Sequence, residues 1–189
     1  MNKNKIINDP VYGFIPIKSR KIFDLLEHPF IQRMRRIRQL GLAEMVYPGA
    51  IHTRFHHALG ALHLMRQALE ILKSKGVDLS DEEIEAAQIA TLLHDTGHGP
   101  FSHSLEETLF ENIKHESLSF LFMKELNHQF NGELSLAVKI FQNTYSKKFL
   151  HQLVSSQLDI DRLDYLNRDS FFEYVFWKIF TARLSSPLN

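Results

Sequence analysis

Cysteine is absent from the 189-residue sequence, tryptophan occurs once, and neither sign of charge is in excess. Without cysteine, the chain can form neither a disulfide framework nor a metal site built on thiolates. Lys and Arg number 22, as do Asp and Glu, so no overall charge attracts the protein to nucleic acid or to a membrane surface. A nucleic-acid partner is therefore not expected, and the lack of cysteine agrees with a cytoplasmic location.

Long hydrophobic runs are also missing. The N-terminal segment MNKNKIINDP lacks the apolar core of a signal peptide. No stretch approaches the roughly 20 apolar residues that span a bilayer, and the nearest, Phe171–Phe180, is short and carries Glu173 and Lys178. We therefore expect no membrane association. The hydrophobic content of 44% over 189 residues is enough for one compact domain with a sizeable core, and the chain is too short for two large ones.

Apolar residues at three- and four-residue spacing predict that most of the chain is helical. The longest helix is expected over Thr53–Lys75, which is followed by Gly76. Ser80 and Glu83 form a capping-box pattern that begins the next helix. Other helices are expected at Ser19–His28, Phe30–Leu40, His115–Asn127 and Glu133–Asn143, with one or two more within Leu150–Asp169.

The segment Ile6–Ile17 has a different pattern. It is rich in β-branched residues and is interrupted by Pro10, Gly13 and Pro16, which is typical of a short extended arm or hairpin. The predicted fold class is therefore all-α, a helical bundle with a short β-hairpin arm at the N-terminus.

Histidine is the one residue type in excess, because eight of the 11 histidines lie between His52 and His115. Among them, His94 and its neighbour Asp95 end an apolar helix, where an aspartate is rarely buried without a partner. Adjacent helical residues diverge by about 100°, so both can reach one metal ion only from a helix end that faces a pocket. The break at Gly97 provides such an end. An imidazole and a carboxylate on one ion suit Zn, Mn or Fe.

Two more ligands can come from other helices. His57 lies in the first turns of the long helix and is the natural third ligand. Asp161 is the candidate for the fourth, since it shares one helical face with Tyr165 and Asp169 at steps of four residues. Taken alone, a His-Asp pair at a helix end is more typical of a cap or a surface pair, and an aspartate-rich helix of a solvated face. The conjunction of these signals favours a metal site.

Three segments resemble the HD-domain deoxynucleoside triphosphate triphosphohydrolases. They are RFHHALG at 54–60, LHDTGHGPFSH at 93–103 and LDIDRLDY at 158–165. The resemblance covers roughly Ile7 to Ser170 in the right order and spacing, and the middle motif is far more specific than a bare His-Asp pair.

The resemblance implies a role for each matching residue. The implied ligands of one divalent transition metal (Mn, Fe or Zn, with Mg as a further candidate for nucleotide phosphates) are His57, His94, Asp95 and Asp161. The implied catalytic groups are His98, Glu106 and His115. The implied contacts to phosphate and sugar are Gln39, Leu40, Arg54, His103, Arg162, Tyr165 and Asp169.

The implied reaction converts a deoxynucleoside triphosphate (dNTP) to a deoxynucleoside and triphosphate. Either His98 or His115 would protonate the departing oxygen or direct the water, and Glu106 would orient one of the two imidazoles. Two alternatives stay open: hydrolysis of another nucleotide phosphoester by an HD-type phosphatase or phosphodiesterase, and an inactive, truncated metal-binding remnant. Full-length relatives are expected to be homo-oligomers.

The sequence departs from the family pattern in three places. Glu106 stands where the family often has aspartate, and His56 stands where relatives often carry glutamate. The resemblance also ends after Ser170, so we expect an HD phosphohydrolase domain over residues 1–170 and an atypical aromatic tail over 171–189. This tail suggests a truncated or frameshifted product, or a fragment.

Overall fold

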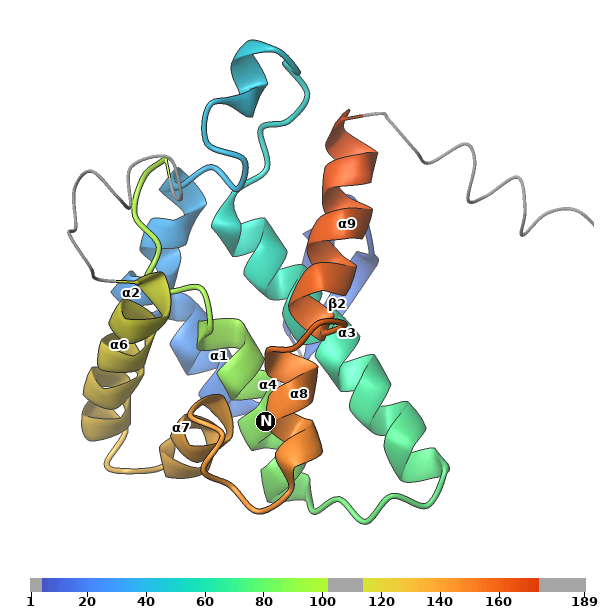
Figure 1. Cartoon of the computed structure of the whole chain (residues 1–189), viewed down its shortest axis with the longest axis vertical. Helices are drawn as coiled ribbons and strands as arrows, with labels where there is room; N and C mark the ends of the chain where they lie inside the picture. Colours follow the sequence, from blue (N-terminus) through green and yellow to red (C-terminus); the bar gives the residue numbers. More distant parts are fainter. Residues whose placement is uncertain (1–4, 102–113, 174–189) are drawn as a thin grey trace, which may run out of the picture.

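The computed structural model describes residues 5–101 and 114–173, and its elements are a bundle of helices and a small two-stranded sheet (Figure 1). The expected all-α class with an N-terminal hairpin is confirmed. The strands and short N-terminal helices are β1 (Lys5–Asp9), β2 (Gly13–Ile17), α1 (Arg20–Glu27), α2 (Pro29–Gln32) and the 3-10 helices η1 (Arg33–Arg36) and η2 (Ala43–Met45). The later helices are α3 (Arg54–Ser74), α4 (Asp81–Leu93), α6 (His115–Gln129), α7 (Ser135–Phe141), α8 (Lys148–Val154) and α9 (Ile160–Glu173).

The centre of the bundle is helix α3. It packs against both α4 and α9, while α4 also contacts α7 and α8. The α3 residues Phe55, Leu59, Met65 and Leu69 are all buried in one hydrophobic core. The described helices include none with the length and hydrophobicity of a membrane span.

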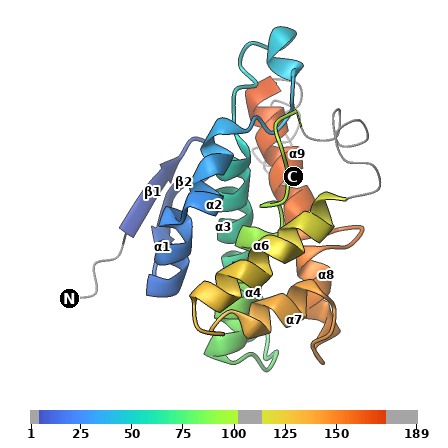
Figure 2. The ribbon, with the colours of Figure 1, turned by 90° about the vertical axis from the view of Figure 1, so that its left-hand side faces the viewer.

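The hairpin lies at one edge of the bundle (Figure 2). Strands β1 and β2 pair antiparallel, with Asp9 opposite Gly13. The Asp9 carboxylate accepts hydrogen bonds from the backbone N–H of Val11 at 2.9 Å and of Tyr12 at 3.0 Å, which stabilises the turn. Ile15 and Ile17 of β2 are buried in the main core, so the hairpin is anchored by apolar packing.

The expected helix at Phe30–Leu40 is wrong in its second half. The helical conformation ends at Arg36, and Ile37 is extended. The reason is a long-range pairing, because Arg38 forms an isolated β-bridge with Thr53 and the Arg54 N–H donates to the Ile37 carbonyl at 2.9 Å. These tertiary hydrogen bonds outweigh the local helical pattern.

The segment Leu150–Asp169 contains a break between two helices. Helix α8 ends at Val154 and α9 begins at Ile160. The Asp159 carboxylate accepts a hydrogen bond from the Arg162 N–H at 2.8 Å, as expected for the residue that caps a helix N-terminus. Helix α9 is described as far as Glu173, and the domain boundary expected at residue 170 stays a prediction.

Candidate metal centre

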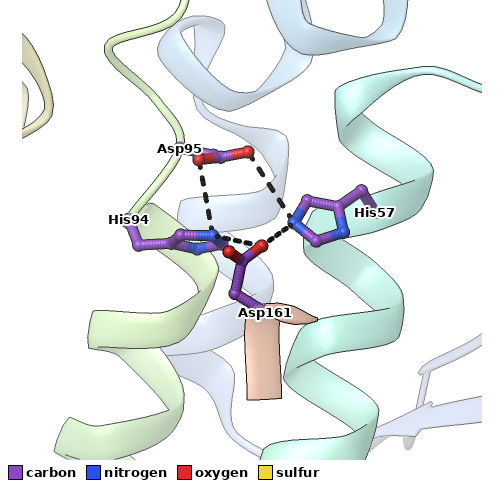
Figure 3. Close-up of side chains that lie close together, drawn as sticks. All are labelled: His57, His94, Asp95 and Asp161. Atoms are coloured by element: carbon purple, nitrogen blue, oxygen red, sulfur yellow. Dashed lines mark ion pairs between the residues drawn. The ribbon is translucent and has the colours of Figure 1, made fainter. Parts of the chain in front are cut away.

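Four side chains that are far apart in the sequence converge between three helices. His57 comes from α3, His94 and Asp95 from the end of α4, and Asp161 from the first turn of α9 (Figure 3). Each offers one nitrogen or oxygen atom, and these four atoms lie within 4.8 Å of one another. The structure thus brings together the four residues that the sequence singled out.

The distances show how tight this cluster is. His57 Nε2 lies 2.8 Å from Asp161 Oδ1 and 3.7 Å from Asp95 Oδ2. His94 Nε2 lies 3.3 Å from Asp161 Oδ1 and 3.4 Å from Asp95 Oδ1. Both Nε2 atoms are buried and make no hydrogen bond of proper geometry, although they face carboxylate oxygens.

The hydrogen-bond partners of the two Nδ1 atoms explain why the Nε2 atoms of His57 and His94 face the cluster. His57 Nδ1 lies 2.7 Å from Asp164 Oδ2, and His94 Nδ1 lies 2.5 Å from the Thr91 carbonyl oxygen. Both partners are acceptors, so each Nδ1 carries the proton and, in a neutral ring, Nε2 presents its lone pair to the cluster. Two lone pairs and two carboxylates that face one point fit a divalent cation.

The charges of the cluster lead to the same conclusion. Burial disfavours the charged form of His57, but the carboxylates of Asp161 and Asp164 outweigh it and raise the pKa of this imidazole to about 10. Burial likewise opposes the charge on His94, and the neighbouring Asp95 and Asp161 raise its pKa to about 9. Burial opposes ionisation of Asp95 too, yet His94 and Arg54 hold its pKa well below its usual range. The carboxylates therefore require positive charge here, which a metal ion supplies when bound.

A second group of side chains adjoins Asp95. The rings of His98 and His115 stack with their centroids 3.8 Å apart, and His98 Nε2 lies 3.4 Å from Asp95 Oδ1. Burial lowers the pKa of His98 to about 4 despite this carboxylate, so the ring is neutral at neutral pH. One ligand atom from each of Asp95, His98 and His115 also lies within 4.8 Å of the others.

Gly97 allows this second group to form. Its N–H donates to Ser119 Oγ at 2.8 Å, which fastens the loop to the start of α6. A Cβ at this position would lie 2.2 Å from the His115 carbonyl oxygen and 2.4 Å from the Ser119 nitrogen. Only glycine therefore lets α6 come close enough to bring His115 over His98.

The other residues that the sequence predicted for the site differ in how close they lie to the metal cluster. Arg54 is buried and its Nη1 donates to Asp95 Oδ2 at 2.6 Å. Asp169 lies on α9 with Tyr165 and pairs with His52 Nε2 at 2.8 Å. Gln39 donates its N–H to the His52 carbonyl at 3.1 Å, which places it beside the start of α3.

Leu40 lies in the turn after Gln39, and Arg162 is exposed on α9. His103 and Glu106 lie outside the described residues.

Sequence reasoning missed several residues that support the cluster. Asp164 binds the outer nitrogen of His57, and His52 pairs with Asp169. Arg33 donates to the carbonyls of Thr96 and His98 and so fixes the loop after Asp95, although an arginine-rich stretch usually indicates a solvated face. One available signal was the spacing of Asp164 and Asp161, which places both on the same side of α9.

The comparisons with known proteins agree with this geometry. The HD domain family matches residues 54–169, so the chain belongs to the HD-domain family. A solved structure titled as a phosphohydrolase from Bacteroides thetaiotaomicron is 56% identical with a TM-score of 0.89, and the match covers 91% of this chain and 43% of that one.

Curated relatives give the same picture. An uncharacterized protein of Bacillus subtilis, YwfO, is 35% identical over 93% of this chain and 42% of its own length. The deoxynucleoside triphosphate triphosphohydrolase SAMHD1 homolog of Dictyostelium discoideum is 29% identical over 89% of this chain and 36% of its own length. The chain thus spans less than half the length of these relatives.

Proposed function

We propose that this chain hydrolyses dNTPs to deoxynucleosides and triphosphate at a centre with one divalent transition metal, Mn, Fe or Zn. The observation that carries the proposal is the convergence of His57, His94, Asp95 and Asp161, with both inward imidazole nitrogens buried and facing carboxylate oxygens. The name of the Dictyostelium relative supports the choice of substrate. A cytoplasmic location and a homo-oligomeric state remain predictions.

The four side chains of the cluster are the proposed ligands. When bound, a metal ion of this kind polarises a phosphoryl oxygen and lowers the pKa of a bound water molecule. Arg54 holds Asp95 in place through its 2.6 Å hydrogen bond, and its planar guanidinium is suited to a phosphate oxygen as well.

His98 and His115 are the proposed proton-transfer groups. His98 is neutral at neutral pH, so its imidazole can accept a proton from water and then, as the imidazolium, pass one to a leaving oxygen. His115 is the first residue of α6, and its ring stacks directly on that of His98. Glu106 is proposed to orient one of these imidazoles.

The substrate contacts proposed for the described residues occupy two places. Gln39, Leu40 and Arg54 lie near the start of α3, and Arg162, Tyr165 and Asp169 lie on α9. The pairing of Asp169 with His52, which precedes α3, links the two places. His103 is proposed as a further contact.

Product analysis tests the proposal. The chain is incubated with each dNTP and Mn²⁺, and the products are separated by ion-exchange chromatography. We expect inorganic triphosphate and a deoxynucleoside, and loss of both with Asp95→Ala. Monophosphate with pyrophosphate would instead indicate another HD-type hydrolysis, and a stoichiometric metal with no turnover would indicate a metal-binding module.

A further inference from the structure

A chain of buried charges connects the N-terminal hairpin with the candidate metal centre. Arg168 on α9 donates from Nη1 to Asp9 Oδ2 at 2.9 Å and from Nε to Asp164 Oδ2 at 2.9 Å. Asp164 then accepts from His57 Nδ1 at 2.7 Å. The side chains of Asp9, His57, Asp164 and Arg168 are all 0% exposed.

Arg168 is held by more than one hydrogen bond to each of the two carboxylates. Arg168 Nη2 makes further hydrogen bonds with Asp164 Oδ1 at 3.1 Å and with Asp9 Oδ1 at 3.4 Å. Buried charges are costly unless each is paired and hydrogen-bonded. One guanidinium balances only one of the two carboxylates that it binds. The group formed by Asp9, Arg168 and Asp164 therefore keeps a net negative charge, and Asp164 presents it to His57.

The sequence makes room for this pair of side chains at Gly60, one turn after His57. A Cβ at position 60 would lie 1.9 Å from Asp164 Oδ1 and 2.2 Å from Arg168 Nη2. Any other residue on this face of α3 would therefore displace Asp164 from His57.

The two inward-facing histidines differ in what holds them. His94 Nδ1 faces a neutral backbone carbonyl, that of Thr91, whereas His57 Nδ1 faces a carboxylate. A carboxylate on the outer nitrogen of a metal-binding histidine fixes the ring orientation and strengthens its inner nitrogen as a donor. Of these two rings, His57 has the stronger support.

We propose that Asp164, held by Arg168 and by Asp9 of the hairpin, is a positioning residue that sets the orientation of His57 and the strength of metal binding. The inference rests on the metal centre of the proposed function. On this inference, Asp9 of the hairpin influences the metal centre indirectly. It binds Arg168, Arg168 binds Asp164, and Asp164 binds His57.

Metal affinity measures this effect without any substrate. Mn²⁺ alone is titrated into the wild type, Asp164→Asn and Asp9→Asn, with the bound ion followed by electron paramagnetic resonance. Asparagine keeps an oxygen acceptor at each position and removes the charge. We expect Asp164→Asn to weaken Mn²⁺ binding by roughly 10- to 100-fold, and Asp9→Asn to weaken it less but in the same direction.

Glu83→Gln is the matched control. Glu83 is a buried carboxylate paired with Lys147 at 2.9 Å, and it belongs to neither cluster. Its replacement should destabilise the fold without changing the affinity for Mn²⁺. Equal loss of affinity in the control and in Asp164→Asn would overturn the inference, because it would reflect general destabilisation.

The wild type provides a second readout that does not depend on how the variants fold. In the Zn²⁺-loaded protein, labelled with ¹⁵N at histidine, His57 should show a proton on Nδ1 that is shifted downfield and protected from exchange. Coordination of zinc through Nδ1 of His57, or the absence of this proton, would refute the inference.

Asp95→Ala separates this inference from the proposed function. If Asp95→Ala abolishes binding of Mn²⁺ while Asp164→Asn leaves the affinity unchanged, the metal centre stands and the positioning role of Asp164 is refuted. If Asp95→Ala binds Mn²⁺ as the wild type does, the metal centre itself is refuted.

Discussion

At the scale of single residues, one departure from the family pattern, His56, has a local physical explanation. His56 stands at the third position of α3, where its Nδ1 accepts a hydrogen bond from the Thr53 N–H at 3.1 Å. This is the contact that a glutamate makes in a capping box. Burial and the charge of Arg168 lower the pKa of His56, which keeps the accepting nitrogen unprotonated.

A substitution tests this capping role. His56→Ala should lower the free energy of unfolding by about 0.5–2 kcal/mol, because the Thr53 N–H loses its acceptor. His56→Glu should recover most of the loss. Urea denaturation of the three proteins measures both effects, and equal stability of the alanine and glutamate variants would contradict the assignment.

At the scale of elements, the contacts between helices decide which side chains meet. Glu83 of α4 accepts from Tyr145 Oη at 2.6 Å and from Lys147 Nζ at 2.9 Å, which fastens the segment before α8 to α4. Burial would raise the pKa of Glu83, but Tyr145 and Lys147 outweigh it and lower the value to about 2.

The sign of the pH effect follows from this shift. The folded-state pKa of Glu83 lies below its ordinary value of 4.5, so its contribution to stability is full above pH 4.5 and is lost as the pH falls toward 2. Glu83→Gln should therefore cost about 1–2 kcal/mol at pH 7 and clearly less at pH 3. Urea denaturation at the two pH values gives the comparison, and a cost that does not depend on pH would show that the charge of Glu83 is unimportant.

Gly97 gives a prediction about the approach of α6. Gly97→Ala places a Cβ against the backbone of His115 and Ser119, so α6 must move away and the stacking of His98 on His115 is lost. We expect hydrolysis to fall at least about 100-fold, while the affinity for Mn²⁺ changes little. Gly99→Ala is the matched control, since a Cβ there would meet no heavy atom within 4 Å among the described residues. Full activity of Gly97→Ala would remove the pair of imidazoles from the mechanism.

At the scale of the whole molecule, the candidate metal centre joins three helices, of which α3 also packs against the other two. Helices α3, α4 and α9 each contribute to the cluster, and α9 reaches it from more than 60 residues further along the chain than Asp95. An ion that binds only the folded state stabilises it by mass action.

Removal of the metal should therefore lower the melting temperature. With free Mn²⁺ at about 100 times its dissociation constant, the stabilisation is about 2.7 kcal/mol, which raises Tm by several degrees for a domain of this size. Thermal unfolding followed by circular dichroism, with Mn²⁺ and then with excess EDTA, checks the shift. Asp95→Ala should melt at the same temperature in both conditions.

The sequence by itself determined the all-α class, the N-terminal hairpin, the capped start of α4 and the four residues of the metal cluster, because helical periodicity, turn residues and specific motifs are local signals. Only the tertiary structure decided that the helix after Pro29 ends at Arg36 and that Asp9, Arg168 and Asp164 support His57. Asp9 and Arg168 are 159 positions apart and His57 and Asp164 are 107 apart, so no local pattern specifies these contacts. They arise because a buried charge needs a partner, and that partner is chosen by how the helices pack.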